Sequence, residues 1–183
     1  SIAGKCMKLL LFSDLHVNTQ SEKTCFEVLE FVLQHARRLN ATVAFLGDWW
    51  DTVYKHASLP TEMQNRFIRF FATKWDVPML AIPGNHDMAT QDEKEHALVP
   101  FSFASHHITI FETPTVHEGV LWVPWRRQHG DLIEALNTPG NVKCIFGHFD
   151  IVGAYVNNST VSQEGLRTDE FPPGVPVYSG HYH

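Results

Sequence analysis

The stretch PMLAIPGNHD, at residues 78–87, decides the fold because it joins a buried strand to a loop of polar side chains. Its apolar first half predicts a strand, and the Pro-Gly pair that follows ends that strand abruptly. The loop then presents an Asn-His-Asp triplet at residues 85–87. A Gly-Asn pair alone is common turn chemistry, so the motif gains weight only if similar strand ends recur in the chain.

Four further apolar runs end in polar residues of the same kinds. They are DLH at residues 14–16, GDWWD at 47–51, GH at 147–148 and GHYH at 180–183. In open α/β sheets, binding sites form outside the carboxyl ends of the strands. The five strand ends therefore predict one site built from Asp, Asn and His side chains.

The bulk composition is that of a globular chain. The chain has 183 residues, of which 44% are hydrophobic and 19% are charged, which is enough for one domain with a sizeable core. Its net charge of −6 argues against a broad, non-specific DNA-binding surface, because such surfaces are usually basic. Two divalent cations would bring the charge from −6 to −2 and would place positive charge at the site itself.

The cysteines and the N-terminus bear on the compartment and on the domain limits. Cys6, Cys25 and Cys144 are far apart and form no C-x-x-C motif, so we expect a reducing, cytoplasmic compartment. No apolar stretch reaches membrane-spanning length, so we expect no membrane partner. Met7 is a natural start; we therefore expect a single domain over residues 7–183, preceded by a non-native remnant at residues 1–6.

The first half of the chain alternates strands with helices. Apolar runs at residues 8–12 and 43–46 predict two strands, and the helical spacing of apolar residues over 21–39 predicts a helix between them. A second helix over 61–74 precedes the strand at 78–82. This order predicts a β-α-β unit with parallel strands.

The second half has shorter strands. Runs at residues 108–111, 115–117 and 120–123 leave no room for crossover helices, so we expect their pairings to be antiparallel. A short helix at residues 131–136 and a buried strand at 142–146 follow.

Several segments between these elements carry no clear chemistry. Residues 88–96 are acidic and polar, which is typical of a solvated face, and residues 156–174 predict a polar loop. The pair His106-His107 has the composition of a metal-binding pair, but a loop pair before the next strand is the favoured interpretation. Arg126-Arg127 could neutralise phosphate, although surface arginines are the more common case.

The spacing of the polar residues suits metal ligands. Side chains two residues apart on an extended segment point to the same side, so Asp14 and His16 can reach one ion together. The alternative for this motif alone is a turn aspartate beside a surface histidine. Gly47 permits a sharp turn that lets the Asp48 carboxylate project over its strand end, where it could bridge two cations. Asp51 is expected to orient a neighbour instead.

The complete donor set indicates two ions. Carboxylate, amide and imidazole donors without thiolate suit Mn, Fe or Zn better than Ca or an iron–sulfur cluster. The candidates are too many for one tetrahedral ion, and they fit two ions about 3.5–4 Å apart that share a carboxylate. The candidate ligands are Asp14, His16, Asp48, Asn85, His148, His181 and His183.

In this order the motifs D-x-H, G-D-x-x-D, G-N-H-[DE], G-H and G-H-x-H resemble those of the calcineurin-like metallophosphoesterase superfamily, over residues 8–183. The resemblance implies a four-layer α-β-β-α sandwich of two mixed sheets. It also implies a metal-dependent phosphoester hydrolase with a binuclear centre, in which manganese is the first choice of metal and iron or zinc are alternatives.

The resemblance further implies a role for each residue. It assigns Asp14, His16 and His183 to the first metal, Asn85, His148 and His181 to the second, and Asp48 to both. It makes His86 a catalytic residue that assists the leaving group while a metal-bridging hydroxide attacks phosphorus, with Asp87 orienting the His86 ring.

Finer motif details look like SbcD-type DNA-repair exonucleases and related phage recombination endonuclease subunits. These details are VPW at residues 123–125, GHF at 147–149, VGA at 152–154 and YSGHYH at 178–183. The likeness implies a DNA exonuclease or endonuclease of double-strand-break repair or recombination, an ATPase partner subunit, and further chain after His183. The alternatives are a phosphodiesterase or phosphatase for small nucleotides or phosphoproteins, and an inactive scaffold with the same fold.

Overall fold

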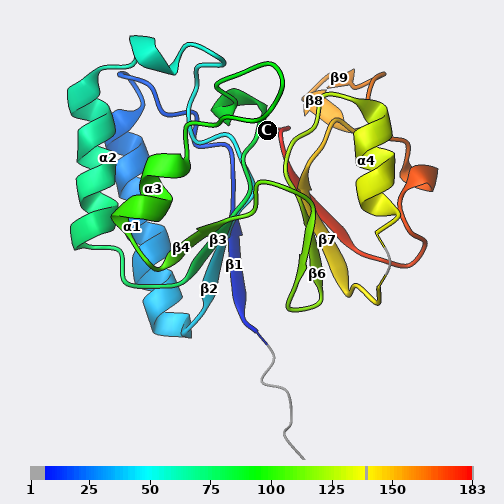
Figure 1. The fold of residues 1–183 in the computed structure, drawn as a ribbon, viewed down its shortest axis with the longest axis horizontal. Coiled ribbons are helices and arrows are strands. Elements are labelled where there is room, and N and C mark those ends of the chain that lie inside the picture. The colour runs from blue at the N-terminus through cyan, green and yellow to red at the C-terminus, as the bar shows by residue number, and fades with distance from the viewer. Residues whose placement is uncertain (1–6, 139, 183) are drawn as a thin grey trace, which may run out of the picture.

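Two four-stranded sheets lie face to face, and helices cover their outer faces (Figure 1). The computed structural model describes residues 7–138 and 140–182. The remnant expected at residues 1–6 and the predicted ligand His183 lie outside the described residues. Four layers in the order α-β-β-α confirm the layer order that the family resemblance implied, although only the second of the two sheets is mixed.

The first sheet is wholly parallel, with the order β1-β2-β3-β4. Its strands are β1 (Leu9–Phe12), β2 (Thr42–Phe45), β3 (Met79–Ala81) and β4 (Ile108–Ile110). Helix α1 (Glu22–Leu39) connects β1 to β2, which confirms the predicted β-α-β unit. Asn40 ends this helix in the left-handed conformation, with φ 49°, which asparagine tolerates better than most residues.

Three helices cover the outer face of the first sheet, because each presents one apolar stripe. They are α1, α2 (Thr61–Thr73) and α3 (Val99–Ala104) (Figure 1). The stripe of α1 buries Leu29, and that of α2 buries Phe67, whose ring meets Trp49 at a centroid distance of 5.7 Å. Trp49 and Trp50 are thus packing residues that anchor the loop after β2 in this core.

The second sheet is mixed and has the order β10-β7-β6-β5. Its strands are β5 (Thr115–His117), β6 (Val120–Val123), β7 (Cys144–His148) and β10 (Val177–Gly180). Only the β5–β6 pair is antiparallel, while β6, β7 and β10 run parallel to one another. Helix α4 (His129–Leu136) covers the outer face of this sheet (Figure 1).

The expectation that all three short strands after residue 107 pair antiparallel is wrong for the first of them. Strand β4 pairs parallel with β3, in the register Met79↔Ile108. Residues 82–107, which include α3, carry the chain back past the sheet and so form a crossover that the strand spacing alone did not reveal. The chain then changes sheets between β4 and β5.

A shared apolar layer fills the space between the sheets. The first sheet contributes Ala44, Leu46, Leu80 and Ile82, and the second contributes Val120, Trp122 and Phe146. Because both faces of each sheet are covered, the central strands read as continuous apolar runs. This layer fixes the two sheets against each other, and with them the loops at their carboxyl ends.

Two loop predictions are wrong in detail. In residues 88–96, which were expected to be solvated, Met88 and His96 are buried and form an isolated bridge. Glu112 holds His96 there, with Oε1 at 2.9 Å from the ring Nε2. Residues 156–174 contain most of an exposed hairpin of β8 (Tyr155–Asn157) and β9 (Thr160–Val161), followed by the short 3-10 helix η3 (Thr168–Glu170).

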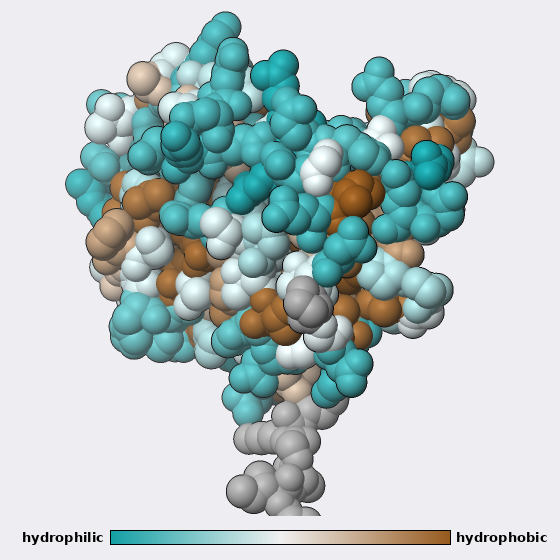
Figure 2. Space-filling view, turned by 45° about the vertical axis from the view of Figure 1, so that its right-hand side comes forward, coloured by the Kyte–Doolittle hydropathy of each residue, from teal (hydrophilic) through white to brown (hydrophobic). Residues whose placement is uncertain are grey.

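The surface is mostly hydrophilic at the end where the parallel strands terminate, which is the top of Figure 2, while hydrophobic residues form several separate spots elsewhere. No helix in the described part of the chain is long and apolar enough to cross a membrane.

Candidate metal centre

The Asp48 carboxylate lies at the centre of the site. Its Oδ2 atom is 3.6 Å from His16 Nε2 and 3.3 Å from His148 Nε2. These two imidazoles come from different sheets, since His16 follows β1 and His148 ends β7. Asp48 is 1% exposed, so its charge must be balanced by groups inside the site.

One group of donors gathers on the side of the first sheet. Ligand atoms of His16, Asp48 and His86 lie within 4.8 Å of one another. Asp14 joins this group, with Oδ1 at 3.7 Å from His16 Nε2. The structure therefore brings together Asp14 and His16, two of the three residues predicted for the first metal. The His86 ring lies beside them.

A second group gathers on the side of the second sheet. Ligand atoms of Asp48, His148 and His181 lie within 4.8 Å of one another. Asn85 Oδ1 is 2.9 Å from His148 Nε2 and 3.1 Å from His181 Nδ1. The three residues predicted for the second metal thus lie together, and Asp48 is common to both groups.

The His148 ring is held so that its lone pair faces the site. Its Nδ1 lies 2.7 Å from the Leu46 carbonyl oxygen, which can only accept a hydrogen bond. The proton therefore sits on Nδ1, and Nε2 points its lone pair toward Asp48 and Asn85. Oxygen and nitrogen acceptors facing one another at these distances repel unless a proton or a cation lies among them, so this donor set fits a divalent cation.

The backbone around the donors is strained. Asp14, His16, Asp48 and His181 have positive φ angles of 56°, 46°, 63° and 106°. Residues other than glycine rarely adopt this region, and such strain gathers at functional sites. Gly84 supplies the close approach that the site needs, because a Cβ there would collide with Asp48 Oδ1 and lie 2.8 Å from His148 Cε1.

The acids and bases of the site stabilise each other's charged forms. Burial opposes the ionisation of Asp48, but the hydrogen bond and the charge of His148 outweigh it and lower the pKa of Asp48. Burial opposes charge on His148 as well, and Asp48 nevertheless raises the pKa of that ring. A hydrogen bond to Asp14 raises the pKa of His16. Divalent cations would take over this balance by replacing the protons.

The expected role of Asp87 in orienting His86 is wrong. The buried Asp87 carboxylate accepts hydrogen bonds of 2.8–3.2 Å from four backbone amides, those of Gly84 and residues 48–50. These four amides use its acceptor capacity, so Asp87 instead ties the loop after β3 to the loop after β2.

His86 is oriented by the loop that begins at Asp51. Its Nδ1 donates to the Asp51 carbonyl at 2.7 Å, which leaves Nε2 as the ring atom for proton transfer. The His86 amide donates to Asp48 Oδ1 at 2.9 Å, and His56 Nε2 lies 2.8 Å from the His86 carbonyl oxygen. Asp51 itself, which was expected to orient a neighbour, lies with its Oδ1 at 3.4 Å from His16 Nδ1.

Sequence reasoning missed Asp150 and Tyr182. Asp150 Oδ1 lies 2.7 Å from His181 Nε2 and accepts a hydrogen bond of 2.7 Å from the Tyr182 hydroxyl. The bond from His181 lowers the pKa of Asp150. The signal was present in Gly147-His148-Phe149-Asp150, where an acid follows a predicted ligand by two residues and so points to the same side of the chain.

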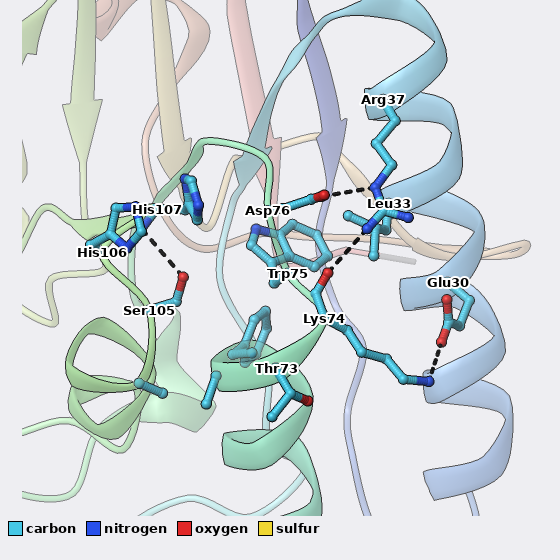
Figure 3. A pocket seen from close by; sticks show the side chains of 13 residues that line it. Glu30, Leu33, Arg37, Thr73, Lys74, Trp75, Asp76, Ser105, His106 and His107 are labelled. Atoms are coloured by element: carbon cyan, nitrogen blue, oxygen red, sulfur yellow. Dashed lines mark hydrogen bonds and ion pairs between the residues drawn. The ribbon is translucent and has the colours of Figure 1, made fainter.

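The histidine pair at residues 106–107 lies away from this centre, in a cavity of about 470 Å³ (Figure 3). The cavity is at the amino ends of β3 and β4, opposite to the loops that carry the donors. Its cations already have partners, because Arg37 pairs with Asp76 at 2.8 Å and Lys74 with Glu30 at 3.3 Å. The interpretation of the pair as loop histidines is therefore the better one.

Arg126 serves the fold. Its guanidinium donates to the carbonyl oxygens of Trp125 and Glu112 at 2.9 and 2.6 Å. Glu93 also approaches it, with Oε2 at 3.8 Å from Nε. Arg127 is exposed, and its backbone amide donates to Glu93.

Comparison with known proteins agrees with this geometry. The sequence model of the calcineurin-like phosphoesterase family matches residues 7–183, which include all predicted ligands and His86. A search of curated proteins finds no match. The family match and the two His/Asp donor groups together support metal-dependent phosphoester hydrolysis at a binuclear centre. This chain belongs to the calcineurin-like phosphoesterase family.

Proposed function

We propose that this chain is a two-metal phosphodiesterase that cleaves DNA. The observation that carries the proposal is the position of Asp48 Oδ2, 3.6 Å from the His16 ring and 3.3 Å from the His148 ring. A single buried carboxylate between two separate donor groups is the arrangement that a binuclear centre requires.

The donor set suggests how the cations are held. Asp14, His16 and His183 would bind one cation, Asn85, His148 and His181 the other, and Asp48 both. Manganese suits these nitrogen and oxygen donors, and iron and zinc are the alternatives. When bound, the cations supply positive charge that stabilises the phosphoryl oxygens as negative charge develops on them.

His86 would act on the leaving group. Because its Nδ1–H is held by the Asp51 carbonyl at 2.7 Å, the protonated ring can donate only from Nε2. A proton given to the leaving oxygen at that atom would lower the barrier to breaking the phosphorus–oxygen bond. The two anchors on its backbone, Asp48 and His56, keep the ring in place during this step.

DNA is proposed as the substrate because of the finer motif likeness to SbcD-type nucleases at residues 123–125, 147–149, 152–154 and 178–183. The hydrophilic surface around the carboxyl ends of the strands is compatible with a polar, extended substrate (Figure 2). An ATPase subunit is proposed as the partner on the same likeness.

The test is hydrolysis with added Mn²⁺ of single-stranded DNA, duplex DNA, bis(p-nitrophenyl) phosphate and p-nitrophenyl phosphate. We expect cleavage of DNA and of the diester, and little cleavage of the monoester. His107→Ala is the matched control, because that ring lies in the cavity at the opposite end of the sheet. Cleavage of the monoester alone would contradict the proposal and indicate a phosphatase, and metal binding without any hydrolysis would indicate a scaffold.

A further inference from the structure

Both ring nitrogens of His181 have oxygen partners. Nδ1 faces Asn85 Oδ1 at 3.1 Å, inside the second donor group, and Nε2 lies 2.7 Å from Asp150 Oδ1, on the outer side. The backbone of His181 is strained as well, with φ 106°, and its amide lies 3.1 Å from Asp14 Oδ1. The ring is therefore held in one orientation from two sides.

The Asp150 contact decides where the His181 proton lies. An ionised carboxylate can only accept a hydrogen bond, and a charge-assisted bond of this length is stronger than one to an amide oxygen. The neutral ring therefore carries its proton on Nε2, toward Asp150. Its Nδ1 lone pair then faces the donor group formed with Asp48, Asn85 and His148.

We infer that Asp150 is a positioning residue of the metal centre, which holds His181 in the tautomer and orientation that present Nδ1 to a divalent cation. This inference rests on the metal centre of the proposed function. A carboxylate that accepts from the second nitrogen of a ligand histidine fixes the ring and makes it a stronger donor.

Asp150 is itself held firmly enough for this role. The Tyr182 hydroxyl donates to its Oδ1 at 2.7 Å, so two hydrogen bonds meet on one oxygen atom. Its carbonyl oxygen accepts from the Leu166 amide at 2.8 Å, and Ile151 forms an isolated bridge with Leu166. Gly165 has φ 101°, and a Cβ there would collide with the Asp150 carbonyl. The backbone contacts of Asp150 thus come from residues 165–166, which lie between β9 and η3 in the chain.

The test compares Asp150→Ala and Asp150→Asn with a matched control, Glu170→Gln. Glu170 makes the same kind of contact, with Oε1 at 2.9 Å from His129 Nε2, but both residues lie outside the donor groups. One readout is Mn²⁺ affinity by calorimetric titration. The second is the tautomer of His181 in the metal-free protein, from long-range ¹H–¹⁵N correlation spectra, with the signal assigned by its loss in His181→Ala.

We expect Asp150→Ala to bind Mn²⁺ about 10–100-fold more weakly, the usual loss when such an outer partner is removed. Asp150→Asn keeps an oxygen acceptor and should lose less, and Glu170→Gln should match the parent protein. The parent should show His181 protonated on Nε2, and Asp150→Ala should show a mixture of tautomers.

Two results would overturn the inference. One is a parent protein in which His181 carries its proton on Nδ1, a result that needs no variant to fold. The other is a folded Asp150→Ala variant with unchanged Mn²⁺ affinity and tautomer. Neither readout uses a substrate, so failure of the proposed DNA cleavage would leave this inference standing.

Discussion

Asp48 differs from the other predicted ligands because its carboxylate meets imidazoles from both sheets. The Asp48 amide is fixed in turn by the Asp87 carboxylate, at 2.8 Å. A ligand shared in this way should affect both metal positions, whereas His16, His148 and His181 each belong to one donor group.

Asp48→Asn should therefore weaken both metal positions. The substitution removes the negative charge that two dications would share, while it keeps the size of the side chain. We expect the bound Mn²⁺ per chain to fall at both positions, as measured by elemental analysis after gel filtration. His16→Gln is the comparison, and it should weaken only the first position. Equal losses in the two variants would contradict the shared role.

His86→Ala should preserve bound metal and lower turnover by about 10²–10⁴-fold, the usual contribution of a general acid. The loss should shrink for a substrate with a good leaving group such as p-nitrophenolate, which needs little protonation. A parallel loss of metal would show instead that His86 is a ligand, a role that its place beside His16 and Asp48 allows geometrically.

At the residue scale, the sequence predicted which side chains gather but not how each is held. The six predicted ligands that the structure describes were identified because each follows an apolar run in the sequence. The function of Asp87 was misjudged because a neighbour in sequence was taken as a neighbour in space, and the 3-10 helix η2 (Asn85–Asp87) turns its carboxylate toward backbone amides.

At the scale of elements, the loop after β3 is packed against the loop after β2 with no room for a larger residue. Gly84 sits at this contact, where a Cβ would collide with Asp48 and crowd His148. The Asp87 carboxylate binds both loops, so neither can move away without breaking buried hydrogen bonds. The two loops therefore behave as one unit.

Gly84→Ala should destabilise the fold by about 1–3 kcal/mol, the usual cost of overpacking, and should reduce Mn²⁺ affinity because Asp48 must shift. Urea unfolding and a metal titration measure the two effects. Gly130→Ala in helix α4 is the control, because a Cβ there meets nothing within 4 Å. Full metal affinity in Gly84→Ala would show that the contact can relax without cost.

Helices and strands were predicted correctly where the hydrophobic periodicity of the sequence is strong. They were missed where tertiary contacts determine the structure. Helix α1 has a clear apolar stripe, and its bounds agree closely with the sequence. The partner of β4 could not be predicted from local spacing. The crossover that precedes β4 contains only the short helix α3, whose six residues are too few to show a clear helical periodicity. The β8–β9 hairpin is exposed on every residue, so it has no alternation to detect.

At the scale of the whole molecule, the centre lies on the seam between the sheets. Asp14, His16, Asp48 and Asn85 follow strands of the first sheet, and His148 and His181 belong to the end of the second. That there are two sheets was implied only by the family resemblance, since periodicity indicated only helices on a sheet and antiparallel strands. The sequence of a single strand does not indicate which of its faces packs against another sheet.

A centre on this seam makes metal binding a source of stability for the whole fold. Free Mn²⁺ at about 100 times its dissociation constant should add about 2.7 kcal/mol, or about 5–10 °C in Tm for a chain of this size. Scanning calorimetry with Mn²⁺ and with EDTA measures this shift. The shift should nearly vanish in Asp48→Asn, and an equal shift in that variant would place the stabilising ion elsewhere.

The contact between the His181 amide and the Asp14 carboxylate joins residues 167 positions apart in the chain. Contacts of such separation form late, after shorter loops have closed, and during synthesis the N-terminal part of a chain emerges first. Strands β1 to β4 can assemble on the ribosome while β10 has not yet been made. The nascent chain therefore lacks His148 and His181 at that stage, and the second donor group is complete only after β10 has docked.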